Sequence, residues 1–383
     1  MKVLTIISHT EHYKLSNGTI VGLGSTVTEL NHLLSIFDKI YHVAMLHKTA
    51  PPTSALPYVS EHIKLIPIKA VGGQGFTDKL SVVWQAPKVL NVVKKALRNS
   101  DCFQFRAPTG IGVYVIPYLI IFSSKKGWFK YAGNWNQKNA PLAYRFQKWL
   151  LKNQNRNVTI NGFWPNQLEQ CLTFENPCLT SNDIKKGNHL VKDKIFNHEA
   201  INFCFVGRLE EEKGIELLIN AFKSLNENEK TRIGKIHIVG KGKNIEIYKS
   251  MVKRSKLNFH FHGFLSREAV HNIYIKSNFI ILPSASEGFP KVIAEALNFG
   301  CLPVVSNVSG ISNYVKDGEN GFLLDSISVS GVVLKLQSIM NLTVQGYFKM
   351  IDFEREIIKK FTFNYYNTRV KNELMKSFLS ENQ

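Results

Sequence analysis

The amino-acid sequence predicts an α/β protein with two domains, each a doubly wound parallel sheet covered by helices. Three observations predict this fold class. The chain has 383 residues, more than one typical hydrophobic core accommodates. In its first half, short runs rich in β-branched and aromatic residues alternate with helical patterns. After a polar segment without periodicity, a second alternating series begins at Ile201.

The first half contains six predicted strands and three amphipathic segments that are predicted helices. The predicted strands are Val3–Ser8, Ile40–Leu46, His62–Ile68, Cys102–Arg106, Trp128–Ala132 and Val158–Asn161. The predicted helices are Ser25–Phe37, Val82–Leu97 and Pro141–Lys152. This alternation is typical of parallel strands joined by crossover helices.

The second half repeats the pattern after residues 176–192, which are rich in Asn, Asp, Lys and Gly and are predicted to be a linker. Its predicted strands are Ile201–Val206, Lys235–Val239, Asn258–His262, Phe279–Leu282 and Leu302–Val305. Its predicted helices are Gly214–Leu225 and Pro290–Phe299. We therefore expect domains at 1–185 and 193–360, followed by an amphipathic C-terminal helix at 361–383 that packs back on the first domain.

Cysteine usage and apolar segments indicate the compartment. The five cysteines are scattered and form no CxxC pair, which fits neither a disulfide framework nor a zinc site. The run Val3–Ile7 is too short for a signal peptide. The longest nearly uninterrupted apolar stretch, Ile111–Phe122, contains Pro117 and falls short of the roughly 20 residues that span a bilayer. We expect a cytoplasmic protein without a structural metal.

The positive charge is concentrated in the first half of the chain. Residues 1–190 hold 22 Lys and Arg against 9 Asp and Glu, or +13 of the total +19. Such a field attracts phosphates in nucleic acid, in anionic lipid or in diphosphate-linked substrates. The alternative is a solvated surface with no anionic partner.

The segment Pro283–Glu295 is the first candidate site, because a strand runs through a short loop into a helix. Gly288 allows a ligand to approach the backbone, and Pro290 suits the first helical turn, whose N–H groups favour an anion. Glu287 lies in the loop and Glu295 eight residues further on, so the two carboxylates can flank one extended ligand. Alternatively, Glu287 caps the helix and Glu295 is a surface residue.

Two further loops follow strands of the same predicted sheet. Arg208 and Lys213, after the strand that begins at Ile201, are spaced to hold two phosphates. The alternative is that both cations neutralise the neighbouring residues Glu210–Glu212. The turn Val239–Gly242 has a GxG pattern, which is a weak signal by itself.

Taken together, these elements resemble the retaining GT-B glycosyltransferases of the family-4 type, also called glycosyl transferases group 1. The resemblance covers about residues 200–325 closely. The family's two glutamates, which have seven residues between them, match Glu287 and Glu295, with the Glu-Gly-Phe-Pro core intact. The remaining matches are Gly207-Arg208, Lys213-Gly214, Val239–Gly242, His262-Gly263-Phe264 and Asp317–Leu323.

The resemblance implies two Rossmann-like domains that face each other across a cleft, with the donor bound by the second domain. It assigns the donor diphosphate to Arg208 and Lys213 and the ribose hydroxyls to Glu295. It assigns the transferred sugar to Glu287. The other donor-site residues that it implies are Gly207, Gly240, Gly288, Phe289, Pro290 and, beside the nucleobase, Phe264. No cofactor and no obligatory divalent metal are implied, because cations and the helix dipole replace the metal.

The first domain departs from the family at the position where relatives carry a histidine facing the donor sugar. The corresponding stretch, Lys130–Trp135, places Asn134 there, and an amide cannot act as a base. His9 and His12, which follow the first predicted strand, are the nearest substitutes. A histidine in a loop is more often a surface residue.

Two more residues of the first domain are candidates for substrate contact. Gly18 lies in a segment that corresponds to the relatives' glycine-rich turn over the donor phosphates, and a plain flexible loop is the alternative. Arg106, at the end of the fourth predicted strand, is a candidate for an acceptor phosphate, with a structural salt bridge as the alternative. Arg106, Asn134 and His9 are thus the acceptor-side candidates.

The function predicted is transfer of a hexosyl residue, with retention, from a nucleotide diphosphate sugar to a saccharide or lipid-linked saccharide, in cell-surface polysaccharide biosynthesis. A polyprenyl-diphosphate-linked acceptor would place the enzyme peripherally at the inner, anionic face of a membrane, through lysines such as Lys125, Lys126 and Lys130. One alternative is a nucleotide-sugar epimerase of the same architecture, although epimerases lack the glutamate pair. Another is a nucleic-acid-binding protein, although no RNP-like or helix-turn-helix signature is present, and we expect no nucleic-acid partner.

Overall fold

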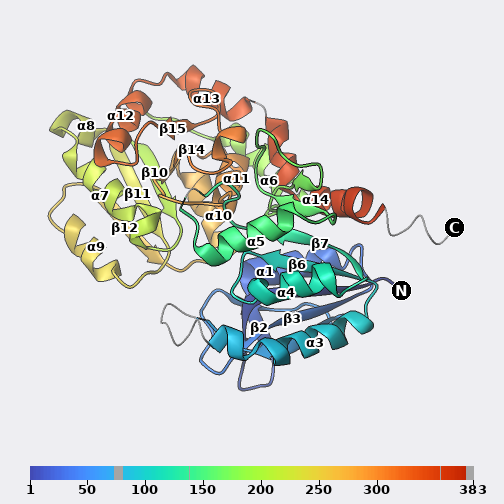
Figure 1. Ribbon diagram of the computed structural model, residues 1–383. Coiled ribbons are helices and arrows are strands. Elements are labelled where there is room, and N and C mark those ends of the chain that lie inside the picture. The colour runs from blue at the N-terminus through green and yellow to red at the C-terminus, as the bar shows by residue number, and fades with distance from the viewer. Residues whose placement is uncertain (73–80, 138, 354, 377–383) are drawn as a thin grey trace. The chain divides into compact units, whose positions relative to one another are not determined.

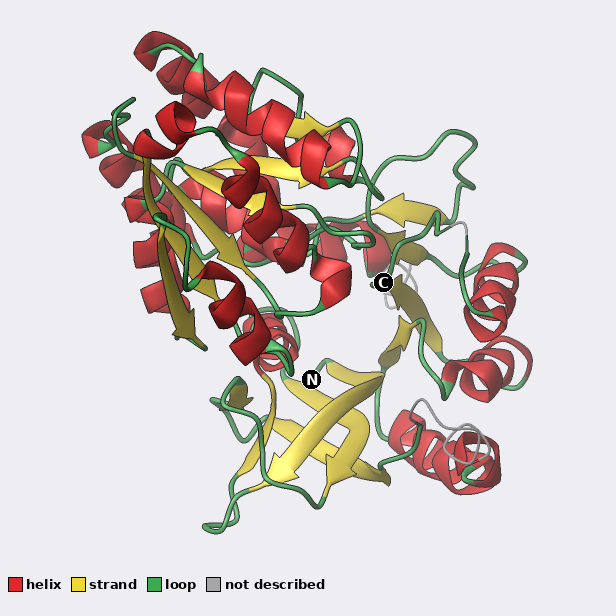
Figure 2. Cartoon of the chain, turned by 90° about the vertical axis from the view of Figure 1, so that its left-hand side faces the viewer, coloured by secondary structure: helices red, strands yellow, loops and turns green. Residues whose placement is uncertain are grey.

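The computed structural model describes residues 1–72, 81–137, 139–353 and 355–376, which form two compact α/β units (Figure 1). The first domain comprises Met1–Asn176 together with the C-terminal segment from Phe363, and the second comprises Pro177–Thr362. Figure 2 distinguishes the strands of both domains, in yellow, from their helices, in red. No helix in the described part of the chain is long and apolar enough to cross a bilayer.

The first domain has a nine-stranded sheet, in which the order β5-β3-β1-β6-β7-β8-β9 is parallel throughout. The parallel strands are β1 (Val3–Lys14), β3 (Lys39–His47), β5 (Ile63–Lys69), β6 (Cys102–Ala107), β7 (Lys126–Tyr131), β8 (Val158–Ile160) and β9 (Cys171–Thr173). Two antiparallel strands, β2 (Ile20–Leu23) and β4 (Ala55–Pro57), extend the sheet beyond β1.

Helices cover both faces of this sheet. The described helices of the domain are α1 (Gly24–Leu33), α3 (Ala86–Arg98), α4 (Gly112–Ile121), α5 (Leu142–Lys152) and α14 (Phe363–Arg369). The predicted strands and helices are confirmed, apart from shifted ends. The apolar run that contains Pro117, which the sequence left without a secondary structure, is α4.

The first strand is longer than the sequence predicts. It continues beyond Ser8 to Lys14, because its last residues pair antiparallel with β2, so that His12 lies opposite Gly22 and Lys14 opposite Ile20. A register shift between Ile7 and Glu11 interrupts its pairing with β3. The predicted position of His9 and His12 after the first strand is therefore wrong, since both residues lie within β1.

The C-terminal segment lies on the first domain. A 3₁₀ segment (Arg355–Phe361) leads into α14, which continues as a π-type turn (Val370–Leu374). The side-chain amide of Asn367 donates to the backbone oxygen of His32 over 2.7 Å, and Tyr366 is buried beside α1. The far end of the predicted helix, from residue 377, lies outside the described residues.

The second domain has a six-stranded parallel sheet in the order β12-β11-β10-β13-β14-β15. Its strands are β10 (Ile201–Val206), β11 (Ile233–Val239), β12 (Asn258–Gly263), β13 (Phe279–Leu282), β14 (Leu302–Ser306) and β15 (Phe322–Leu324). Its helices in the described residues are α6 (Ser181–Leu190), α7 (Ile215–Ser224), α8 (Glu227–Thr231), α9 (Ile245–Val252), α10 (Arg267–Lys276), α11 (Lys291–Asn298), α12 (Val329–Met340) and α13 (Val344–Asp352). Because all paired strands are parallel, their carboxyl ends meet at one edge, where α/β proteins bind ligands.

The predicted linker at residues 176–192 is wrong in part, because most of it forms helix α6. Thr180 caps this helix: its hydroxyl accepts from the backbone N–H of Asp183, and Asp183 binds back to the N–H of Thr180. This capping box is a local signal that sequence reasoning missed. The division between the units consequently falls after Asn176 instead of at residue 185.

Candidate active site

The loops that follow β10, β11 and β12 are held together by main-chain hydrogen bonds. Gly207 N donates to Val239 O over 3.0 Å, and Gly240 N donates to Gly263 O over 2.8 Å. Gly240 has a φ of +140°, and a Cβ atom at this position would lie 1.8 Å from Gly207 O. Only glycine fits there, so the sequence's GxG turn brings three strand ends into contact.

A second glycine joins the loop after β10 to the loop after β13. Gly214 is the N-cap residue before α7, with a φ of +74°, and a Cβ there would lie 2.3 Å from the backbone oxygen of Pro283. Next to this contact, Ala285 N donates to Glu212 O over 2.9 Å. Two segments that are about 70 residues apart in sequence are thereby placed side by side.

This contact brings together Lys213 and Glu287, two of the residues that the sequence singles out. Lys213 Nζ lies 2.6 Å from Glu287 Oε1, and the side chains are 21% and 13% exposed. A half-buried cation and carboxylate at the carboxyl edge of the sheet can both exchange their partner for a ligand that carries phosphate and hydroxyl groups. Glu287 therefore binds Lys213, and the alternative that it merely caps the following helix finds no support.

The N-terminus of α11 lies beside Glu287 and has no side-chain cap. Pro290 is the extended residue before the helix, with φ −69° and ψ 120°. The helix therefore begins one residue later than the sequence predicts. The N–H groups of the first turn are therefore suited to an anion. The side chain of Phe289 is buried against Tyr314 and Phe361, with ring centroids 4.8 Å away in both cases. Only its backbone can contribute to a ligand site.

Arg208 forms an ion pair with a neighbouring glutamate of its own loop. Its side chain is 71% exposed, and its Nη1 atom lies 2.9 Å from Glu210 Oε1. This is the local neutralisation that the sequence left open as the alternative for Arg208. An exposed pair of this kind contributes little free energy, so a diphosphate could displace Glu210.

Glu295 lies in a different cluster from Lys213 and Glu287. Its carboxylate accepts a hydrogen bond from the hydroxyl of Tyr274 over 3.5 Å and lies 3.9 Å from Nε of Arg267. Arg267 also binds Asp183 over 2.8 Å. Burial raises the pKa of Glu295 to about 7, while Arg267 and Lys291 act in the opposite direction. The surface position that was the alternative for Glu295 is wrong, and no local sequence signal pointed to Arg267 or Tyr274.

Phe264 follows β12, where relatives are expected to place the nucleobase. Its side chain is 42% exposed, so the ring is available for stacking. Next to it, Nδ1 of His237 lies 2.9 Å from Nε2 of His262. Burial lowers the pKa of His237 to about 4, so this imidazole is neutral at pH 7.

Comparison with known proteins identifies the family of the second domain. Residues 189–352 match the family described as glycosyl transferases group 1. The second domain is a glycosyl transferases group 1 domain. An uncharacterized glycosyltransferase of Methanocaldococcus jannaschii is 27% identical over 209 residues, which are 53% of this chain and 55% of that protein. The chain spans about half the length of the curated relatives that it matches.

Solved structures extend the likeness in fold to both domains. Anabaena HepE in complex with UDP and glucose is similar with a TM-score of 0.68 at 16% identity, covering 98% of this chain and 100% of that chain. Sucrose-phosphate synthase from Thermosynechococcus elongatus is similar with a TM-score of 0.69 at 16% identity, covering 99% and 100%. The glycosyltransferase domain and its N-terminal partner therefore have the GT-B fold of two Rossmann-like domains.

The N-terminal partner of the group 1 domain keeps Arg106 in its interior. Arg106 Nη2 lies 2.9 Å from Glu29 Oε1, and Lys130 Nζ lies 2.6 Å from the same oxygen. All three side chains are buried. The prediction that Arg106 meets an acceptor phosphate is therefore replaced by the structural salt bridge. Lys130 is likewise not at the surface, so its predicted role in membrane contact is wrong.

The histidines of β1 are not surface residues either. His12 is buried, and its Nε2 atom lies 2.7 Å from the hydroxyl of Tyr58. His9 is half-buried and packs against Gly72 and Gly110, since a Cβ at either glycine would lie 3.3 Å from its Cε1 atom. Burial lowers the pKa of His9, which favours a neutral imidazole. A direct role of His9 stays a prediction.

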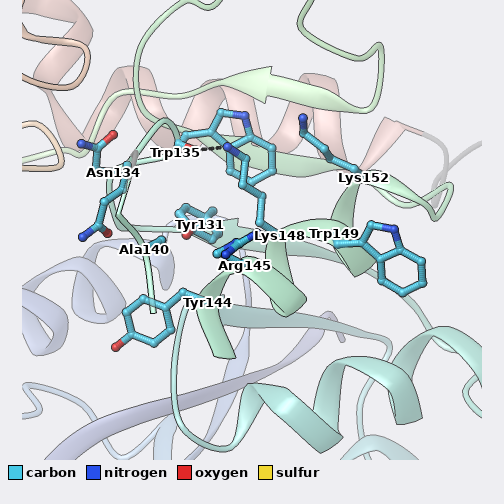
Figure 3. Close-up of a pocket in the computed structure, with 10 residues that line it drawn as sticks. Tyr131, Asn134, Trp135, Ala140, Tyr144, Arg145, Lys148, Trp149 and Lys152 are labelled. Carbon is cyan, nitrogen blue, oxygen red and sulfur yellow. Dashed lines mark hydrogen bonds between the residues drawn. The ribbon is translucent and has the colours of Figure 1, made fainter. Parts of the chain in front are cut away.

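Gly18 and Asn134 occupy turns at the carboxyl end of the first sheet's strands. Gly18 has a φ of +86° in the hairpin between β1 and β2, where its N–H donates to Leu15 O over 2.9 Å. Contact of this turn with the donor phosphates stays a prediction. Asn134 follows β7, and its Oδ1 accepts from the N–H of Asn136 over 2.9 Å. It also lines a pocket of about 290 Å³, which Figure 3 shows.

In the described residues, no group of three or more His, Cys, Asp or Glu side chains is placed to hold a metal ion. The five cysteines are all buried and unpaired by disulfides. The expectation that the donor diphosphate needs no divalent metal stays a prediction.

Proposed function

We propose that this protein is a retaining glycosyltransferase that moves a hexosyl residue from a nucleotide diphosphate sugar to a saccharide or lipid-linked saccharide, in cell-surface polysaccharide biosynthesis. The observation that carries the proposal is the pair Lys213–Glu287 beside the uncapped N-terminus of α11. A cation, a carboxylate and oriented N–H groups at one sheet edge suit a substrate that joins a diphosphate to a sugar.

Binding of the donor would exchange the partners of this pair. The diphosphate takes the ammonium of Lys213 and the guanidinium of Arg208, in place of Glu287 and Glu210. The carboxylate of Glu287 then accepts hydrogen bonds from hydroxyls of the sugar. These cations stabilise the charge that develops on the leaving diphosphate, which is where they lower the barrier.

The group-transfer step is a front-face displacement. The bond between the anomeric carbon and the diphosphate oxygen breaks, and a bond from the acceptor oxygen to that carbon forms on the same face. The acceptor's hydroxyl proton passes to the departing phosphate oxygen. No side chain is needed as a base, which is consistent with Asn134 at the position where relatives carry histidine.

Glu295 is proposed to bind the ribose hydroxyls through its carboxylate, next to Arg267. Phe264 is proposed to stack on the nucleobase. The UDP complex of the Anabaena neighbour supports testing uridine nucleotides first. A cytoplasmic location with peripheral contact to an anionic membrane belongs to the same proposal and is supported by the excess of +13 in residues 1–190.

A donor screen tests the function. UDP-, GDP- and ADP-sugars are compared for hydrolysis and for thermal stabilisation of the protein, with and without EDTA. We expect one nucleotide series to be hydrolysed slowly, with EDTA having no effect. Calorimetry with the bare nucleoside diphosphate should then show weaker binding by Glu295→Gln and unchanged binding by Glu287→Gln, which should instead lose turnover. A protein that neither binds nor hydrolyses any nucleotide sugar would contradict the proposal.

A further inference from the structure

The pocket in the first domain lies where a substrate site is expected in an α/β fold. It is formed by Tyr131 at the carboxyl end of β7, by the loop that follows this strand and by α5 (Figure 3). Its volume of about 290 Å³ is close to the lower limit of about 300 Å³ for small-molecule sites. A space of this size suits one sugar ring with a charged substituent.

The pocket gathers positive charge without acidic neighbours. Arg145, Lys148 and Lys152 of α5 all line it, at positions i, i+3 and i+7 of the helix. Residues 102–168 contain nine Lys and Arg and no Asp or Glu. In the part of the chain that the structure describes, these three side chains form no ion pair with a carboxylate. Three cations on one helix face repel one another, and an anion between them would relieve that repulsion.

Lys148 shows that this charge is held in place. Its Nζ atom donates to the backbone oxygen of Trp135 and lies 5.1 Å from the centroid of that ring. Burial and, next, the charge of Lys152 lower the pKa of Lys148. An ammonium group has three donors, so Lys148 can bind an anion while it keeps the contact with Trp135.

Aromatic rings and amides supply the rest of the lining. Tyr131 and Trp135 are buried and meet edge to face, with centroids 4.9 Å apart. Trp149 lines the pocket but is 59% exposed. Aromatic rings present apolar faces that suit the C–H face of a sugar, and the side-chain amides of Asn134 and Gln137 suit its hydroxyls. A solvated basic surface would need none of these rings.

We propose that this pocket binds a sugar that carries a phosphate ester, as the charged part of the acceptor. The inference rests on the proposed glycosyltransferase function and names its acceptor class. The phosphate would lie among Arg145, Lys148 and Lys152, and the sugar ring would lie against Trp149. The same chemistry is present in a soluble sugar phosphate and in a saccharide joined to a lipid through phosphate. Cations and rings also bind single-stranded RNA, but along a track of several nucleotides, whereas this is one small pocket.

Binding of glucose 1-phosphate, glucose and inorganic phosphate to the full-length protein tests the proposal, with calorimetry as the readout. We expect glucose 1-phosphate to bind at least about tenfold more tightly than either fragment at low salt. The double variant Arg145→Gln/Lys148→Met should lose at least about tenfold in affinity for glucose 1-phosphate. Trp149→Ala, an exposed position with little risk to folding, should weaken glucose 1-phosphate but not phosphate.

Lys249→Gln is the matched control, because it removes an exposed lysine of α9 in the second domain. It should bind glucose 1-phosphate as the wild type does. The lipid-linked source is tested with neutral phosphatidylcholine vesicles that contain a glycosyl phosphate lipid. If the wild type co-sediments with these vesicles and the double variant does not, the acceptor is the lipid-linked form. If the protein binds glucose 1-phosphate but does not co-sediment with the vesicles, the acceptor is the soluble form.

The proposal is overturned if glucose 1-phosphate binds no better than phosphate, if the α5 variants bind it normally, or if a random oligonucleotide displaces it at lower concentration. Nucleoside diphosphate binding is measured on the same samples. A wild-type protein that does not bind nucleoside diphosphate would contradict the proposed function. If the wild type and every α5 variant bind nucleoside diphosphate, a negative result with glucose 1-phosphate contradicts the acceptor pocket only.

Discussion

The two domains neutralise their lysines and arginines in opposite ways. In the second domain, Lys213 pairs with Glu287 at the edge of the sheet, and both side chains are partly open to solvent. In the first domain, Arg106 and Lys130 share the single carboxylate of Glu29, and all three side chains are buried. Among the contacts of the described residues, Lys213 and Glu287 form a pair with one charge of each sign, whereas in the first domain Glu29 binds two cations.

This difference distinguishes an ion pair that a ligand can open from a buried cluster that stabilises the fold. A one-to-one pair near solvent can open, because a phosphate replaces the carboxylate and a sugar hydroxyl replaces the ammonium. A buried carboxylate that holds two cations cannot open without leaving a charge unpaired in the interior, which is costly. The difference supports the proposed substrate contacts of Lys213 and Glu287 and a structural role for Arg106 and Lys130.

The largest expected effect is on the stability of the first domain. Glu29→Gln keeps the shape of the side chain but removes the charge that Arg106 and Lys130 share. Breaking a buried charge cluster in this way costs about 3–5 kcal/mol. Urea unfolding of the first domain measures the loss. Glu227 is the control, because it also meets two lysines, at 3.0 and 3.1 Å, but at the surface.

Glu227→Gln should leave the unfolding transition almost unchanged, since exposed pairs contribute little. Equal losses in Glu29→Gln and Glu227→Gln would mean that burial does not distinguish the two clusters.

The next largest effect is on catalysis by the second domain. Lys213→Ala should lower turnover roughly a hundredfold or more, because it removes a charge from the leaving diphosphate. Arg208→Ala should have an effect of similar size if Arg208 leaves Glu210 for the donor. Steady-state rates with the donor found by the screen measure both. Unchanged rates in both variants would refute the diphosphate clamp, and the Lys213–Glu287 pair would then be structural.

The comparison also explains how much the sequence could predict. Arg208, Lys213 and Glu287 lie within a few residues of a strand end, so a local pattern reports their position at the sheet edge. Glu29 and Lys130 are 101 residues apart, and no local pattern reports such a contact.

The same reasoning applies to the secondary structure. The five predicted strands and two predicted helices of the second domain follow from periodicity, because their apolar residues are buried against one sheet. The extension of β1 to Lys14 depends on pairing with β2, and α6 depends on the cap at Thr180 instead of on an apolar stripe. Periodicity predicts neither of these.

A smaller effect is expected from Glu295, whose pKa of about 7 exceeds its ordinary value of 4.5. A carboxyl whose pKa is raised in the folded state binds a proton more tightly there than in the unfolded chain. The cost of ionising it is therefore absent below pH 4.5, grows as the pH rises toward 7 and is constant above.

Wild-type stability should consequently fall relative to Glu295→Gln between pH 5 and pH 8. The full shift corresponds to about 3 kcal/mol. We expect about 1–2 kcal/mol, because solvent that reaches the 14% exposed carboxylate lowers the cost of its ionisation. Denaturation of both proteins at the two pH values measures the difference. A constant difference would mean that Arg267 and Lys291 compensate the burial completely.

An effect of about the same size concerns the excess of +13 in the first 190 residues, and it tests whether that domain also contacts a membrane. Ile121 and Phe122, at the end of α4, are 68% and 74% exposed, and Lys125 and Lys126 follow after two serines. Each lysine near an anionic surface contributes about 1 kcal/mol, so Lys125→Gln/Lys126→Gln should weaken binding to anionic vesicles roughly thirtyfold at low salt.

Co-sedimentation with anionic and with neutral vesicles measures this binding. The wild type should bind only the anionic vesicles and should dissociate at high ionic strength, since the contact is screened beyond a Debye length. Lys249→Gln, in the second domain, should bind as the wild type does, because its lysine lies outside the domain with the charge excess. A protein that stays in solution with anionic vesicles at low salt would remove the membrane contact. The assignments of Lys213 and Glu287 would stand, because they depend on the other domain.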